Sequence, residues 1–224
     1  MIIILSMKLI SKTGFHFFCS GNFMFFIDRD KKDQDIFFKT NLNAFAEISK
    51  DEYMRNKFGE TCKTIESAYT ECIHLANGEY LTCIVPGSTI IHYSNNGKKI
   101  KEYGIGHFET GFDLTYSISL DKNGKLWIAQ PMSHYVGQFE LDTENELFRI
   151  GGDYENPDTF DYPEQVRAFG DFVYVCDMGN SRICKINIDT KELTAYKKYE
   201  EPVWEFGQFR KKEIVKLASG IYEI

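Results

Sequence analysis

The sequence lacks the short motifs that identify the common enzyme classes. The serine-hydrolase pattern GxSxG, the zinc-protease pattern HExxH and a phosphate-binding glycine loop are all absent from its 224 residues. Gly104-Ile105-Gly106 is followed by His107-Phe108-Glu109, so it does not complete a dinucleotide-binding fingerprint. The missing catalytic motifs favour a non-catalytic function.

Long apolar runs are also missing. No stretch approaches the ~18 residues needed to cross a bilayer. The N-terminal stretch 1–10, MIIILSMKLI, has no basic region before its short apolar run, Lys8 and Lys12 interrupt it, and no small-x-small cleavage site follows. We therefore expect a β-strand here instead of a signal peptide, no membrane association, and a cytoplasmic protein.

None of the six cysteines forms a CxxC pair, which argues against a zinc site. Cys72 and Cys83 would lie opposite each other if the turn at Asn77-Gly78 pairs Leu75 with Tyr80. Such a pair could form a cross-strand disulfide, but with no export signal we favour two small buried thiols.

An excess of basic charge is absent as well. The formal net charge is −7, which argues against a nucleic-acid or anionic-membrane surface. The basic clusters Lys197-Lys198 and Arg210-Lys211-Lys212 fall on turns and strand ends. They do not lie on the face of the fold, described below, where the loops are expected to converge. We therefore expect nucleic acid not to be a partner.

What the sequence does contain is a repeated hairpin, clearest between Asp171 and Asp189. The run 172–176, FVYVC, is typical of a buried strand, and Gly179-Asn180 provides a reversal. The alternation of apolar and polar residues over 182–188 then indicates a second strand with one buried face.

The same order of strands and turns recurs along the chain. The turn residue Gly124 follows Gly78 by 46 residues, and Gly170 follows Gly124 by 46. A period in the forties that carries four short strands is the signature of a β-propeller. We therefore predict an all-β fold, a single β-propeller of four-stranded antiparallel blades over residues 1–224. Five blades are expected, at about 14–59, 60–104, 105–151, 152–199 and 200–224, or six if the first segment contains a second irregular unit.

The two ends of the chain are complementary. The last blade has only three strands, at 203–206, 213–218 and 221–224, whereas residues 7–13 form a strand with no blade of their own. Pairing them closes the ring and removes exposed strand edges. In the irregular first blade we expect Phe23 to Ile27 as the inner strand, 36–38 and 44–48 as the next two, and the segment Lys50 to Gly59 as the fourth.

The segment from Pro163 to Ile183 resembles the NHL repeat. It has a proline before the first strand, an aromatic-rich second strand that ends in Asp177, a Gly179-Asn180 turn and a basic residue, Arg182. The resemblance is partial in the preceding blade and weak elsewhere. It implies a propeller fold and no particular activity.

Ligand sites in such rings usually lie where the loops of every blade converge. On that face we select His107, His134 and Asp177 as candidate catalytic residues, and Asn180, Arg182, Tyr135 and Trp204 as candidate ligand-binding residues. The simpler interpretations are a turn-stabilising role for Asp177, Asn180 and Arg182, and ordinary packing for the histidines. The acidic run 153–161 could hold Ca²⁺, but it lacks the ordered ligand spacing, so a solvated loop is favoured.

Three functions are consistent with these features. The favoured one is a non-catalytic scaffold without a cofactor, which binds a protein, peptide or glycan through its loop face. The alternative is a propeller lyase or lactonase with a divalent ion, Ca²⁺ or Mg²⁺, in the central channel. RNA binding is the third and is disfavoured by the acidic balance.

Overall fold

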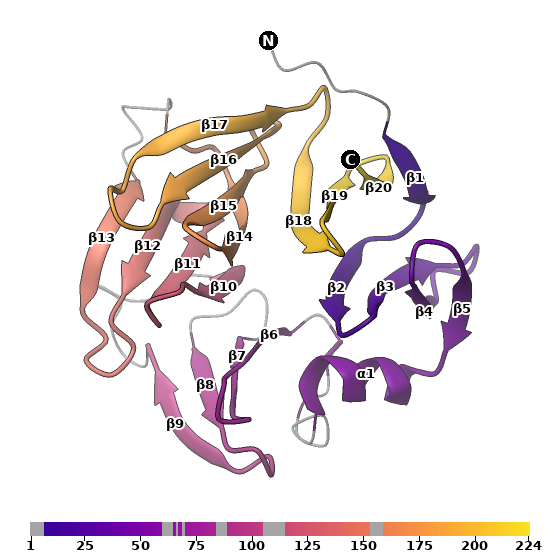
Figure 1. The fold of residues 1–224 in the computed structure, drawn as a ribbon, viewed down its shortest axis with the longest axis horizontal. Coiled ribbons are helices and arrows are strands. Elements are labelled where there is room, and N and C mark those ends of the chain that lie inside the picture. The colour runs from indigo at the N-terminus through magenta and orange to yellow at the C-terminus, as the bar shows by residue number, and fades with distance from the viewer. Residues whose placement is uncertain are drawn as a thin grey trace.

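The computed structural model describes residues 7–59, 65, 67–68, 70–83, 89–104, 115–152 and 159–224. These residues form five four-stranded antiparallel sheets, arranged as the blades of a ring (Figure 1). The predicted five-bladed β-propeller is confirmed.

Each of the first four blades takes its strands in chain order, from the centre outward. Blade 1 contains β2 (His16–Ser20), β3 (Phe23–Arg29), β4 (Asp35–Thr40) and β5 (Phe45–Ile48). Blade 2 contains β6 (Glu71–His74), β7 (Tyr80–Cys83), β8 (Ile90–Tyr93) and β9 (Lys99–Tyr103). Blade 3 contains β10 (Ser117–Leu120), β11 (Leu126–Gln130), β12 (Tyr135–Phe139) and β13 (Glu146–Gly151). Blade 4 contains β14 (Pro163–Phe169), β15 (Phe172–Asp177), β16 (Arg182–Asn187) and β17 (Leu193–Lys198).

Blade 5 is built from both ends of the chain, as the sequence predicted. It contains β18 (Val203–Phe209), β19 (Lys212–Leu217) and β20 (Gly220–Glu223), and β1 (Lys8–Ser11) is its outermost strand. β1 runs antiparallel to β20, with Lys8 opposite Glu223 and Ser11 opposite Ile221. The two strands lie side by side in Figure 1, indigo against yellow, and this pairing closes the ring.

Blade 1 differs from the sequence prediction in two ways. The inner strand is β2, so Phe23 to Ile27 belongs to the second strand. Lys50–Phe58, expected as the fourth strand, is the helix α1. Ser49 caps it by accepting a hydrogen bond from the backbone N–H of Glu52 at 3.1 Å. The apolar residues of this segment follow helical spacing, so the helix buries them.

α1 fills the junction between blade 1 and blade 2. Tyr53, Met54 and Phe58 are buried and pack with Phe25 and Ile27 of β3 in one hydrophobic cluster. The helix contacts β4 and β2 of blade 1 and also β6 of blade 2. It therefore adds an apolar wedge at a place where the other blades pack sheet against sheet, and it carries Lys57 toward the centre of the ring.

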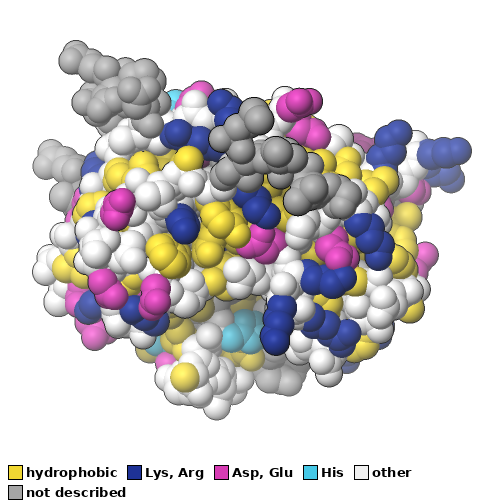
Figure 2. Space-filling view, turned by 45° about the horizontal axis from the view of Figure 1, so that its top comes forward, with side chains coloured by type: hydrophobic (Ala, Val, Ile, Leu, Met, Phe, Trp, Pro, Cys, Tyr) yellow, Lys and Arg dark blue, Asp and Glu magenta, His cyan; other side chains and the backbone are white. Residues whose placement is uncertain are grey.

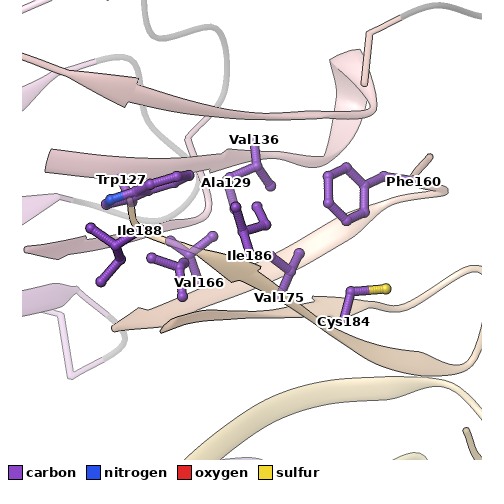
Figure 3. Packing of buried hydrophobic residues seen from close by; sticks show 10 residues of the cluster. Trp127, Ala129, Val136, Phe160, Val166, Val175, Cys184, Ile186 and Ile188 are labelled. Carbon is purple, nitrogen blue, oxygen red and sulfur yellow. The ribbon is translucent and has the colours of Figure 1, made fainter. Parts of the chain in front are cut away.

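The blades pack through apolar faces, as the junction of blades 3 and 4 shows (Figure 3). Trp127 and Val136 of blade 3 meet Val166, Val175 and Ile186 of blade 4, and each of these side chains is 0% exposed. Burial of five such side chains contributes on the order of 2 kcal/mol each. The rigid blades are thereby held at fixed positions around the centre.

Cys72 and Cys83 do not lie opposite each other. The hairpin of blade 2 pairs Cys72 with Thr82 and Glu71 with Cys83, one residue away from the register that the sequence suggested. A shift of one residue turns the two side chains to opposite faces of the sheet. Cys83 is buried, and Cys72 is partly exposed.

The inner turns of four blades place a glycine at positive φ, namely Gly21, Gly78, Gly124 and Gly170. Blade 5 has Arg210 and Lys211 instead, between the paired residues Phe209 and Lys212, and their φ values are 50° and 65°. A two-residue turn with both residues left-handed strongly prefers glycine at its second position. Lys211 is therefore strained.

Replacement of Lys211 with glycine is expected to raise the free energy of unfolding by about 0.5–1 kcal/mol, because it removes the left-handed penalty. Urea denaturation at neutral pH measures the change. The matched control is Lys198→Gly at the end of strand β17, which should destabilise the protein because glycine weakens a strand. Equal destabilisation by both substitutions would contradict the assignment of the turn.

Candidate functional site: the central channel

The innermost strands β2, β6, β10, β14 and β18 surround a central channel. The residues at or next to their starts, which are His16, Glu71, Tyr116, Glu164 and Trp204, line one cavity, so all five strands begin at the same end of the channel. A cavity of about 490 Å³ opens at that end and is lined by Tyr116, Glu164, Gln165, Trp204, Glu205 and Lys216. We call it the acidic cavity. A second cavity of about 490 Å³, lined by Cys19, Lys57, Cys72, His74, Arg167 and Gln208, follows the strands to their far ends. We call it the basic cavity. His16 and Glu71 line both.

A largely buried ion pair crosses the channel from blade 4 to blade 2, with the side chain of Glu71 9% exposed and that of Arg167 22% exposed. Arg167 donates from one guanidinium nitrogen to both carboxylate oxygens of Glu71, at 2.9 Å each. Its other terminal nitrogen donates to the Ser117 hydroxyl at 2.9 Å, so the side chain also ties in blade 3. Burial alone would raise the pKa of Glu71, but the charges of Arg167 and Lys57 hold it below its usual value.

A second polar chain joins blade 5, blade 1 and helix α1. Glu205 contacts His16 Nδ1 at 2.6 Å and accepts from the backbone N–H of Phe17 at 3.0 Å. The Lys57 ammonium lies 2.6 Å from His16 Nε2 and donates to the Ala68 carbonyl at 2.8 Å. Burial lowers the pKa of Lys57 to about 8, against the opposing influence of Glu71 and Glu205. This chain fixes α1 to the channel wall.

Glu164 is different from these paired groups. It lies at the start of β14 and lines the acidic cavity, and none of the described residues forms a hydrogen bond or ion pair with its carboxylate. Burial and the nearby charge of Glu205 raise its pKa to about 7. Burial and Glu164 also raise the pKa of Tyr116 on the same cavity wall. The channel therefore contains one half-buried carboxylate without a counter-ion among the described residues.

Of the residues selected from the sequence, Trp204 lies in the acidic cavity, where its indole is 37% exposed. Asp177, Asn180 and Arg182 form a separate network at the turn between β15 and β16 and line neither channel cavity. Asp177 is fully buried, and it accepts from Arg182 Nε at 2.6 Å and from the Asn180 amide at 2.9 Å. These contacts make the turn rigid.

Asp177 accepts its hydrogen bonds within this turn from the side chains of Asn180 and Arg182, and no described backbone N–H of the turn donates to it. Its other oxygen accepts from the backbone N–H of Asp161 at 2.7 Å, and Arg182 reaches the Thr159 carbonyl at 2.6 Å. Burial raises the pKa of Asp177, although the hydrogen bonds that it accepts from Asp161, Asn180 and Arg182 act in the opposite direction. Asp177 therefore connects two loops of blade 4.

His134 lies close to this network. It follows the short 3-10 helix η2 (Pro131–Ser133), and its Nδ1 is 3.4 Å from the Asp161 carboxylate. Its ring packs edge-on against Tyr162, with the centroids 4.9 Å apart. The structure thus brings His134 and Asp177 together through Asp161. Tyr135 is buried beneath the Arg149 guanidinium, 3.9 Å above its ring. His107 lies outside the described residues.

The residues selected from the sequence did not include Glu71, Glu164, Arg167 and Glu205. One signal would have found them. Each is a charged residue inside or at the start of a short strand, and the propeller repeat makes those strands the innermost ones. A charge in such a strand must face the channel, because the other positions pack against neighbouring blades.

Two further features concern metals and membranes. Among the described residues, no group of three or more His, Cys, Asp or Glu side chains is placed to hold a metal ion. Most of the acidic run 153–161 lies outside the described residues.

Within the part of the chain that the structure describes, no helix is long and apolar enough to cross a membrane. The face in Figure 2 shows basic, acidic and hydrophobic side chains interspersed.

A ring of five blades around a polar channel defines this chain as a β-propeller. No protein-family model matches it, and no curated protein matches it by sequence. Similar solved structures include a streptogramin B lyase, with 14% identity, a TM-score of 0.52, and coverage of 98% of this chain and 72% of that one.

Two further structures support the same fold. A catalytically inactive virginiamycin B lyase from Staphylococcus aureus with quinupristin has 14% identity and a TM-score of 0.50, over 98% of this chain and 74% of that one. The computationally designed protein Ika8 has 12% identity and a TM-score of 0.51, over 94% of this chain and 57% of that one. At these identities the likeness establishes the propeller fold and carries no activity to this chain.

Proposed function

We propose that this chain is a non-catalytic binding propeller that holds a segment of a protein or peptide partner at the acidic end of its channel. The observation that supports this most directly is the acidic cavity. It combines an exposed indole, a phenol and a carboxylate that has no partner among the described residues, at the end of the channel where the innermost strands begin. Concave sites with aromatic walls and a few polar groups are typical of binding sites. The NHL-type repeat of blade 4 is part of the same proposal. Its turn residues Asp177, Asn180 and Arg182 bind one another and stabilise the turn between β15 and β16.

Selection of random peptides on the immobilised protein tests this function. We expect the recovered peptides to bind Trp204→Ala at least tenfold more weakly than the unaltered protein, because the indole forms a wall of the cavity. The matched control is Phe45→Ala on the outermost strand of blade 1, where the ring is 52% exposed and distant from the channel. Peptides that bind both variants equally, or a failure to recover any, would contradict the proposal.

The alternative is a lyase or lactonase that uses a divalent ion. It is favoured by the contact of His134 with Asp161 beside Asp177, and by the fold shared with streptogramin B lyase. Under this alternative, Mg²⁺ or Ca²⁺ should raise the melting temperature, and His134→Ala should abolish that rise. If His134→Ala leaves the metal-dependent rise in melting temperature intact, the ion does not bind at the network of His134, Asp161 and Asp177.

A further inference from the structure

We propose that the acidic cavity receives the basic side chain, lysine or arginine, of the bound segment. This inference rests on the proposed function and names the chemistry that the cavity recognises. It follows from the charge, the aromatic wall and one polar donor of the cavity.

The charge of the cavity is incompletely balanced. Glu205 is satisfied by His16 and the backbone of Phe17, and Glu71 by Arg167. Glu164 has no such partner among the described residues, although it is half-buried. Lys216 also lines the cavity, but its ammonium donates to the Leu217 carbonyl at 2.5 Å and forms no ion pair with Glu164. A ligand cation would supply the missing partner.

The aromatic walls favour the same ligand. Trp204 presents its indole, and Tyr116 its phenol, to the space that Glu164 lines. The faces of these rings attract ammonium and guanidinium groups, and tryptophan does so most strongly. The long aliphatic stem of a lysine or arginine side chain also packs well against an apolar ring. A neutral apolar side chain would also pack against the ring, but it would leave the Glu164 carboxylate without a counter-ion.

One buried donor supplies a contact for the ligand backbone. Gln165 is only 4% exposed, and its side-chain oxygen accepts from the Phe206 N–H at 2.7 Å. That hydrogen bond fixes the orientation of the amide, so its NH₂ group is the remaining donor. No described residue accepts from this group, and Gln165 lines the cavity. A peptide carbonyl next to the basic side chain would satisfy it.

The test uses N-acetyl-lysine methylamide and its uncharged analogue N-acetyl-norleucine methylamide on the full chain. The readout is the indole N–H resonance of Trp204 in an NMR titration. Trp127, the other tryptophan, is fully buried, and loss of one signal in Trp204→Phe assigns the two. We expect the lysine compound to shift the Trp204 signal saturably and to bind at least fivefold more tightly than the norleucine compound.

Glu164→Gln should remove most of that preference, whereas Glu192→Gln, an exposed glutamate of the same blade, should leave it unchanged. Equal binding of the two compounds, or no saturable shift with either, would overturn the inference. If random peptides still require Trp204 in either case, the proposed function stands and only the basic side chain is wrong. If peptide binding also fails, the proposed function itself falls.

Discussion

Replacing Arg167 with methionine is expected to lower the free energy of unfolding by about 3–5 kcal/mol at pH 7, the usual cost of removing one partner of a buried ion pair. Methionine keeps most of the volume of the side chain, so the loss comes from charge and hydrogen bonding. Glu71, only 7% exposed, would lose both of its bonds to the guanidinium. Urea denaturation followed by tryptophan fluorescence gives the difference.

Two controls separate the ion pair from general damage. Adding Glu71→Met to Arg167→Met should recover at least half of the loss, because a well-packed apolar pair avoids the uncompensated charge. Lys99→Met removes one partner of the exposed pair with Glu102, and it should cost less than about 1 kcal/mol. A double variant as unstable as the sum of the two single changes would contradict the account.

The pH dependence gives a third check. Because the pKa of Glu71 is lowered in the folded protein, its ionised form stabilises the fold above the unfolded pKa, and this contribution is lost as the pH falls. Without Arg167 the carboxyl of Glu71 would protonate more readily. The deficit of Arg167→Met should therefore be largest at pH 7 and smaller at pH 4.5.

The ring could be predicted because its signals are local and repeated. Turn glycines such as Gly124 and Gly170 mark the same place in successive blades, and the short strands between them alternate as sheets require. Closure by β1 followed from counting strands at the two ends of the chain. Helix α1 was missed because its segment was assigned to the fourth strand of blade 1, which is in fact β5, although Ser49 followed by Glu52 is a capping signal.

The channel could not be predicted in the same way, because its contacts join distant positions. Glu71 and Arg167 are 96 residues apart, and His16 and Glu205 are 189 apart. Which residues meet there depends on the exact register of five innermost strands. The same sensitivity separated Cys72 from Cys83. Trp204 was selected for its expected nearness to the loop face, whereas Glu164 beside the same cavity could be recognised only from its place at the start of an innermost strand.

Glu164, which has no counter-ion among the described residues, should destabilise the protein at alkaline pH. Its folded pKa of about 7 lies above the unfolded value, so the protonated form is favoured by folding. Stability from this group is fully present below the unfolded pKa of 4.5 and is lost as the pH rises through 7. The groups that line the same cavity are Tyr116, Glu205, Lys216, His16 and Glu71, and of these Glu205 contributes to raising the pKa.

Glu164→Gln should consequently stabilise the protein at pH 8 by on the order of 2 kcal/mol and have little effect at pH 5, because glutamine resembles the protonated acid. Urea denaturation of both proteins at the two pH values measures this, and Glu192→Gln serves as the exposed control. A gain that is equal at pH 5 and pH 8 would show that packing, and not ionisation, limits stability at this position. If Glu164→Gln is more stable but no longer discriminates the lysine compound from the norleucine compound, the loss of discrimination cannot reflect unfolding. This result would show that the carboxylate is retained for binding at the expense of stability.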